Sequence, residues 1–206
     1  MISVIIPTMW LAEGLLDRLH QLSLIAEVGE IILIDNSETP PDLEIPKLVH
    51  IREYKNTYVN PAWNKGVELS KHDRLCIMND DIGFEDDLFS QVEPHISEDK
   101  GMIGLYEFDG VPYRDEDKLF KLVDTKRWRG MGYACLFFIH KKSYVEIPEM
   151  KIWYGDDYLF HCNTKTNYYM ANANVWGTPS ITSRNPIFDP IKQRDSEIYQ
   201  QLLERE

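Results

Sequence analysis

The amino-acid sequence predicts an α/β domain with a mostly parallel central sheet and helices on both faces. In its first half, short apolar runs alternate with longer segments of helical periodicity, which is the pattern of βαβ units. The apolar runs show little polar alternation, as is typical of strands covered on both sides. Polar residues follow these runs, and sheets of this kind bind ligands beyond the carboxyl ends of their strands.

The first half of the chain contains regularly spaced predicted elements. The predicted strands cover residues 2–6, 30–35, 48–53, 74–79 and 101–106, and Pro7 ends the first of them. The predicted helices cover residues 11–28, residues 61–71, and a segment that begins near Asp86 and is limited by Pro94.

The second half is less regular. We predict a connecting loop with a short strand over residues 113–132, a strand over 133–140, a helix entered near Asp156, a strand region over 167–177 and a polar helix from 189 onward. No linker composition separates the two halves, so we expect one domain over residues 1–206.

Composition and charge narrow the class of protein. A chain of 206 residues with 43% hydrophobic residues can bury a sizeable core. The net charge of −12 does not favour nucleic acid as a partner, since such binding rests on Lys and Arg. Three widely spaced cysteines, Cys76, Cys135 and Cys162, indicate reduced thiols of a cytoplasmic protein. No signal peptide or transmembrane segment is expected.

Polar residues follow three of the predicted strands. They are Pro7 and Thr8 after the first, Asp35, Asn36 and Ser37 after the second, and Asn79, Asp80 and Asp81 after the fourth. Because parallel strands end at the same edge of a sheet, we expect these groups to converge.

The Asn79-Asp80-Asp81 segment is a candidate metal site. Mg²⁺ and Mn²⁺ prefer oxygen ligands and often combine one or two carboxylates with substrate phosphates. Neighbouring residues in an extended chain point to opposite sides, so we expect one Asp to hold the metal and the other a hydroxyl or backbone group. An acidic turn that ends the strand is the alternative. The acids at positions 85–87 are expected to begin the next helix.

Other candidates also have a structural alternative. Asp35 ends a buried strand and can accept from a ribose hydroxyl or a base N–H, or it can form an Asx turn. We expect Asn60 to cap a helix with Pro61 in its first turn. Asn64 and Gly66 then lie where backbone N–H groups favour anions, and Asn64, a poor helix former, is expected to have a separate role.

The segment WYGDD combines aromatic and acidic residues. Asp156 or Asp157 can act as a base if partly buried beside aromatic rings, because burial raises a carboxyl pKa. Trp153 and Tyr154 can stack on a sugar ring. Capping of a helix by Asp156, with Asp157 favoured by the helix dipole, is the alternative and is compatible with both roles.

Together these segments resemble a family 2 glycosyltransferase of the GT-A fold. The resemblance covers roughly residues 2–176 and is carried by SVIIPT, EIILIDNS, NPAWNKGVELSKHDRLCIMNDDIGF, GYACLFFIHKKSYVEI and IWYGDDYLFHC. It implies a nucleoside-diphosphate sugar donor, an acceptor hydroxyl and a Mn²⁺ or Mg²⁺ cofactor.

The resemblance also implies roles for individual residues. Asp81 matches the metal-binding position of the Asp-x-Asp motif, and Asp157 matches the general base of an inverting transfer. The implied donor-binding residues are Pro7, Thr8, Asp35, Asn36, Asn64, Gly66, Asn79 and Asp80. The implied acceptor-binding residues are Trp153, Tyr154 and Asp156. Residues 1–106 would then bind the donor, and residues 107–206 would face the acceptor.

The sequence departs from the family pattern at two places. Asn79 stands at the first position of the Asp-x-Asp motif, and WGTPSITSRN has no His where the family often has a late metal ligand. An inactive nucleotide-sugar-binding module on the same fold is therefore the alternative function. Arg127 and Arg129 are candidates for diphosphate or acceptor contacts, or are surface charges.

Other nucleotide-dependent classes fit less well. The segment PTMWLAEG after the first predicted strand lacks the basic, Gly-rich loop of a nucleotidyltransferase. It also lacks the G-x-G-x-x-G fingerprint of a dinucleotide enzyme.

Overall fold

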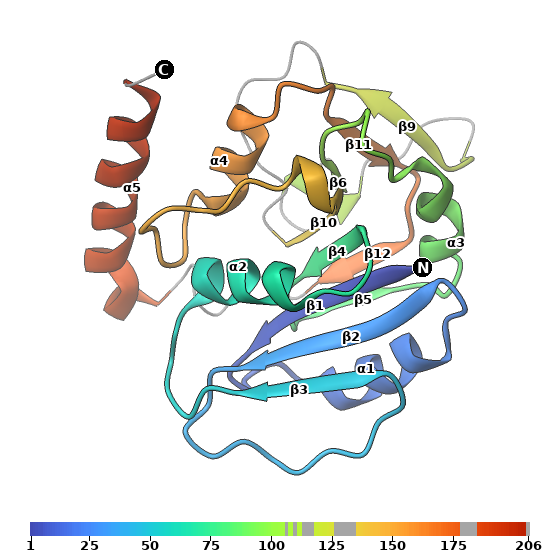
Figure 1. Cartoon of the computed structure of the whole chain (residues 1–206), viewed down its shortest axis with the longest axis horizontal. Helices are drawn as coiled ribbons and strands as arrows, with labels where there is room; N and C mark the ends of the chain where they lie inside the picture. Colours follow the sequence, from blue (N-terminus) through green and yellow to red (C-terminus); the bar gives the residue numbers. More distant parts are fainter. Residues whose placement is uncertain (106, 109–110, 113–117, 126–134, 178–184, 205–206) are drawn as a thin grey trace.

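The computed structural model describes residues 1–105, 107–108, 111–112, 118–125, 135–177 and 185–204. In this part of the chain, a central sheet has eight strands in the order β3-β2-β1-β4-β10-β6-β11-β9 (Figure 1). Their bounds are β1 Ile2–Thr8, β2 Val28–Asp35, β3 Leu48–Arg52, β4 Arg74–Met78, β6 Ile103–Leu105, β9 Lys121–Asp124, β10 Leu136–His140 and β11 Tyr168–Ala171.

The sheet combines a parallel half with a mixed half. Strand β1 pairs in parallel with β2 and β4, and β2 pairs in parallel with β3. Strand β10 is antiparallel to both β4 and β6, whereas β6 and β11 are parallel and β9 is antiparallel to β11. The predicted α/β fold with a mostly parallel sheet is confirmed.

Helices cover both faces of the sheet. Helix α1 (Leu15–Leu24) and helix α3 (Leu88–Val92) pack on one face. Helix α2 (Val59–Leu69), helix α4 (Gly155–Cys162) and helix α5 (Asp189–Leu203) contribute to the core on the other face. Figure 1 shows α1 and α2 on opposite sides of β1 and β2.

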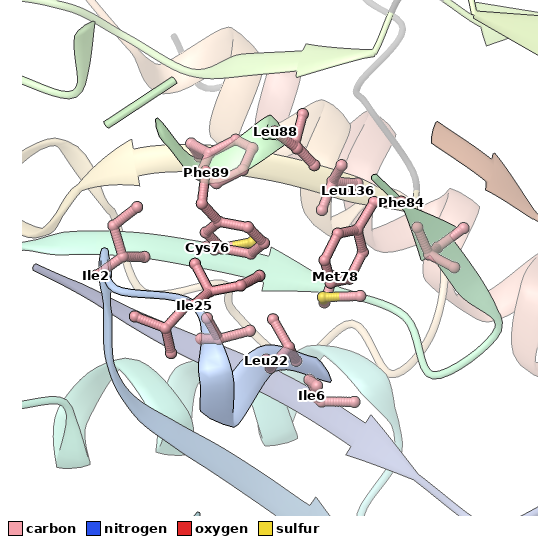
Figure 2. Close-up of a cluster of buried hydrophobic side chains, with 14 of the residues drawn as sticks. Ile2, Ile6, Leu22, Ile25, Cys76, Met78, Phe84, Leu88, Phe89 and Leu136 are labelled. Atoms are coloured by element: carbon pink, nitrogen blue, oxygen red, sulfur yellow. The ribbon is translucent and has the colours of Figure 1, made fainter. Parts of the chain in front are cut away.

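Alternation along the strands produces two cores. In β1, Ile2, Val4 and Ile6 face the α1 side, whereas Ile5 faces the α2 side. Figure 2 shows the α1-side core, with Phe84 and Phe89 among its side chains. The ring centroids of these two residues are 5.3 Å apart, in an edge-to-face arrangement. Cys76 is fully buried there, and burial raises the pKa of its thiol well above the usual value, which keeps it protonated.

Short elements complete the described chain. Strand β5 (Ile82–Phe84) pairs antiparallel with β12 (Val175–Gly177), and β7 (Glu107–Phe108) pairs with β8 (Val111–Pro112). The 3₁₀ helices are η1 Glu93–His95, η2 Lys141–Ser143 and η3 Pro186–Phe188. The predicted strand region 167–177 is thus two strands, β11 and β12, in different sheets.

Several predicted ends of elements in the first half of the chain were wrong. Strand β1 does not end at Pro7 but continues to Thr8, with Pro7 paired opposite Ile34. Helix α1 begins only at Leu15, because Gly14 precedes it in the left-handed region with φ of 73°. Helix α3 likewise begins at Leu88 rather than near Asp86, and the chain continues through Pro94 as the 3₁₀ helix η1.

The predicted cap of helix α2 was also wrong. The helix already includes Val59 and Asn60, and its N-cap is Tyr58, which has a φ of 69°. The Asn56 side-chain oxygen accepts the Tyr58 N–H at 2.8 Å, so Asn56 satisfies the backbone at this end.

None of the helices in the described residues has both the length and the apolar character that a membrane span requires.

We predict that Gly66→Ala lowers the free energy of unfolding by about 1–3 kcal/mol, because a Cβ there would lie 2.3 Å from Cγ2 of Ile5 in β1. Urea denaturation measures the change, with Glu68→Ala on the exposed side of the same helix as the control. A Gly66→Ala protein as stable as the control would contradict this packing.

Candidate functional site

The carboxyl ends of β1, β2 and β4 bring three polar groups together. Thr8 pairs with Asp35 in the β1–β2 register, and the Asn36 N–H donates to the Thr8 carbonyl at 2.8 Å. The Thr8 hydroxyl donates to Oδ2 of Asp80, after β4, at 2.7 Å. We call this edge, formed by Thr8, Asp35, Asn36 and residues 79–81, the carboxyl edge. The predicted convergence is confirmed.

Asp35 is fully buried and accepts four hydrogen bonds. The Ser37 N–H and hydroxyl donate to Oδ1, at 2.9 and 2.6 Å. The Trp10 indole N–H lies 2.5 Å from Oδ2, and Nε2 of His50 lies 3.0 Å from the same atom. Burial alone would raise the Asp35 pKa, but the bonds from Ser37, Trp10 and His50 outweigh it and hold the pKa below its usual value. The Asx-turn alternative is thus realised through Ser37.

Asp80 is held between Thr8 and a basic residue of helix α1. Nη2 of Arg18 donates to the Asp80 carbonyl and also to the Glu13 carbonyl, the latter at 2.8 Å. Burial raises the Asp80 pKa, and the Thr8 bond and the Arg18 charge only partly offset this. As expected from the alternation, Asp80 binds a hydroxyl of the protein, while the partly exposed Asp81 leads into β5.

The carboxyl edge continues into the segment that precedes helix α4. The Asn36 side-chain oxygen accepts from the N–H and hydroxyl of Thr57, at 3.2 and 2.6 Å. Three residues later, the Asn60 N–H donates to the Lys151 carbonyl at 2.9 Å, and its side-chain amide donates to the Trp153 carbonyl at 3.2 Å. The start of α2 therefore joins Asn36 to residues 151–153.

Asn64 and Gly66 have structural contacts that the sequence did not indicate. The Asn64 amide donates to the Ile147 carbonyl at 2.8 Å, and its oxygen accepts from the Tyr144 hydroxyl and the Ile147 N–H, at 2.8 and 3.0 Å. Gly66 lies against Ile5 of β1. These contacts give both residues a role in packing and hydrogen bonding, and donor binding by either of them stays a prediction.

Helix α5 holds the same segment through a buried carboxylate. Asp195, with no exposed surface, accepts from the N–H groups of Lys151, Ile152 and Trp153, at 3.0, 2.8 and 3.2 Å. Residues 151–153 are thus fixed from two sides, by the start of α2 and by α5.

The predicted acceptor-binding residues lie at the start of helix α4. Tyr154 is its N-cap, in the left-handed region with φ of 64°, and its ring stacks on Tyr199 of α5 with 5.1 Å between centroids. Asp156 and Asp157 both lie in the first turn, so Asp156 is not the cap. Burial, together with the charges of Asp157 and Asp156, raises the pKa of Tyr199 to about 12.

Several important residues were not found from the sequence. They are Trp10, Arg18, His50 and Asp195, each of which meets its partner far along the chain. One signal was available, because Arg18 is the only Lys or Arg before Lys47. Arg127, Arg129 and most of the segment WGTPSITSRN lie outside the described residues.

The oxygen donors at the carboxyl edge fit a hard divalent cation. Asp81 supplies a carboxylate and Asn79 an amide oxygen, both partly exposed at the end of β4. Within the described ranges, no three His, Cys, Asp or Glu side chains gather around one point.

We predict that Asp35→Asn lowers the free energy of unfolding by about 2 kcal/mol at pH 7, since its amide would face the Trp10 and His50 donors. The pKa of Asp35 is lower in the folded state than its value of 3.8 in the unfolded state, so ionised Asp35 stabilises the native state at pH values above 3.8. This stabilisation is lost as the pH falls through the folded-state pKa. The difference between wild type and variant should shrink below about pH 4.

Urea denaturation across this pH range measures both effects. Asp42→Asn, whose side chain is 95% exposed, is the control and should change stability little. A pH-independent difference between Asp35→Asn and wild type would contradict the depressed pKa.

We predict that Asp195→Ala lowers the free energy of unfolding by about 3 kcal/mol, because three backbone N–H groups would lose an acceptor that is itself fully buried. Thermal and urea unfolding measure the loss. Glu197→Ala, on the exposed side of α5, is the matched control, and equal stability of the two variants would contradict the role of Asp195.

Comparisons with known proteins give matches only at the level of structure. No protein-family model matches the sequence, and no curated protein matches it. Solved structures match with confidence, at low sequence identity.

Three of these structures represent the group. Residues 1–349 of S. aureus TarS align with a TM-score of 0.65 at 14% identity, covering 86% of this chain and 60% of that one. Glucosyl-3-phosphoglycerate synthase from Mycobacterium tuberculosis aligns with a TM-score of 0.65 at 12% identity, covering 100% and 78%. GalNAc-T7 aligns with a TM-score of 0.62 at 14% identity, covering 91% and 45%.

The chain thus spans about 60% of the length of the TarS structure. The chain therefore has the GT-A-like fold of nucleotide-sugar glycosyltransferases.

Proposed function

We propose that this chain transfers a sugar from a nucleoside-diphosphate sugar to an acceptor hydroxyl, with inversion at the anomeric carbon. The proposal rests on one observation: Thr8, Asp35 and Asp80 meet at the carboxyl edge. Structures with the same fold support it, since one holds UDP-GlcNAc and another holds Mn²⁺, UDP and phosphoglyceric acid.

The donor half, residues 1–106, would bind the nucleotide at the carboxyl edge. Asp35 would accept from the base or ribose, and Pro7, Thr8 and Asn36 would shape the site around it. All four acceptor positions of Asp35 are occupied in this structure, so a base N–H would replace one donor. The Trp10 indole is the donor we expect to leave, because it comes from the loop after β1.

Asp81, with Asn79 beside it, would hold Mn²⁺ or Mg²⁺ together with the donor diphosphate. The bound cation would neutralise charge on the departing nucleoside diphosphate. Asp80 would orient this segment through its bond to Thr8, which ties the end of β4 to the end of β1.

The acceptor side, within residues 107–206, would supply the base. Asp157, in the first turn of α4, would take the proton of the acceptor hydroxyl, whose oxygen attacks the anomeric carbon from the face opposite the leaving group. Trp153, Tyr154 and Asp156 would contact the acceptor. The backbone of Trp153 is positioned by Asn60 and Asp195, so the start of helix α4, and with it the base, would be held at a fixed place relative to the carboxyl edge.

The test is a panel of nucleotide sugars incubated with the protein and Mn²⁺, with donor hydrolysis and thermal stabilisation as readouts. We predict that at least one donor stabilises the protein, and that Asp157→Asn lowers turnover by about 10²-fold or more without loss of donor binding. Asp189→Asn, an exposed acid in the first turn of α5, is the matched control.

The outcomes separate the alternatives. If no nucleoside diphosphate or nucleotide sugar binds, the proposed function is wrong. Donor binding without any turnover would identify the chain as a nucleotide-sugar-binding module. Full turnover in Asp157→Asn would show that another group acts as the base.

A further inference from the structure

Helix α1 places one basic side chain against the candidate metal segment. Nη2 of Arg18 donates to the Asp80 carbonyl, and the Arg18 charge interacts with the carboxylates of Asp80 and Asp81. Arg18 is also the only Lys or Arg among the first 46 residues of a chain with a net charge of −12. A positive charge in this position is therefore a specific feature of the carboxyl edge.

Part of the guanidinium remains available to a ligand. Nη2 binds the Glu13 and Asp80 carbonyls, and Nε is buried without a hydrogen-bond partner. Nη1 makes no hydrogen bond to the described residues, and it is not one of the polar atoms that are buried without a partner. It is therefore accessible. Gly14 leaves room for it, since a Cβ there would lie 3.2 Å from Nη1.

We propose that Arg18 is a donor-binding residue that meets the diphosphate of the nucleotide sugar beside Asp81 and supplies a fixed positive charge there. This inference rests on the proposed function and extends it to a residue outside the Asn79-Asp80-Asp81 segment. A guanidinium is always charged, and the N–H groups of Nη1, which make no hydrogen bond to the described protein, can donate to phosphate oxygens.

The fixed charge acts in opposite directions on the two ligands of this edge. It attracts the diphosphate, so nucleotide would bind even without a divalent metal. It repels a divalent cation, so the metal alone would bind more weakly than the carboxylates would otherwise allow. A purely structural role for Arg18, as a tie between α1 and the end of β4, would instead weaken both kinds of binding together.

The experiment measures two affinities by isothermal titration calorimetry. UDP is titrated in EDTA, and MnCl₂ is titrated without nucleotide, for wild type, Arg18→Gln and Arg18→Lys. Arg18→Gln should weaken metal-free UDP binding by about tenfold or more and strengthen Mn²⁺ binding by about threefold or more. Arg18→Lys keeps the charge but not the planar fork, so its Mn²⁺ affinity should stay near that of wild type.

Arg74→Gln is the control, because it makes the same change in net charge. Arg74 lies at the start of β4, at the opposite end of the strand from the candidate metal segment. It should leave both affinities unchanged. The inference would be overturned if Arg18→Gln weakened both UDP and Mn²⁺ binding, or if it changed neither. It would also be overturned if EDTA abolished the binding of UDP to the wild-type protein. Failure of the wild type to bind UDP even with Mn²⁺ would count against the proposed function itself.

Discussion

Strand β1 lies between two parallel neighbours, and this pairing decides where the polar residues of the site are placed. Its register puts Thr8 beside Asp35 on one side, and the β4 pairing brings Asp80 within reach of the Thr8 hydroxyl on the other. Because all three strands run in the same direction, their last residues share one edge. The apolar residues upstream, buried against α1 and α2, hold the three strands together.

The segment that precedes helix α4 depends on contacts of another kind. Residues 151–153 belong to no regular element, yet their backbone groups are satisfied by Asn60 from the start of α2 and by Asp195 from α5. These hydrogen bonds place the segment that leads directly into helix α4. Asn60 also follows closely on Thr57, which binds Asn36, so the two sides of the site are joined by one short stretch of chain.

The sequence predicted the elements whose signal is local and missed the contacts that join distant segments. Strands β1 to β4 and helix α2 were recognisable because β-branched runs and helical periodicity are read within a few residues. The positions of Thr8, Asp35 and Asp80 followed from their places at strand ends. The hydrogen bond between Arg18 and Asp80 joins residues 62 positions apart, and no local sequence pattern predicts such a pair. Asn60 was wrongly predicted to be the cap, because helix α2 begins directly after Tyr58, which has a positive φ. A tyrosine rarely adopts a positive φ, so the sequence does not indicate that the helix begins there.

The place of β10 in the sheet has a consequence for folding during synthesis. Residues 1–78 can already form the parallel half of the sheet, but one edge of β4 stays open until β10, which begins at Leu136, arrives and pairs with it. Strand β6 leaves the ribosome earlier, yet it does not pair with β4 and lies beyond β10. An unpaired, apolar β4 edge invites association with other chains. This edge of β4 therefore has no partner in the nascent chain until residues 136–140 have been synthesised.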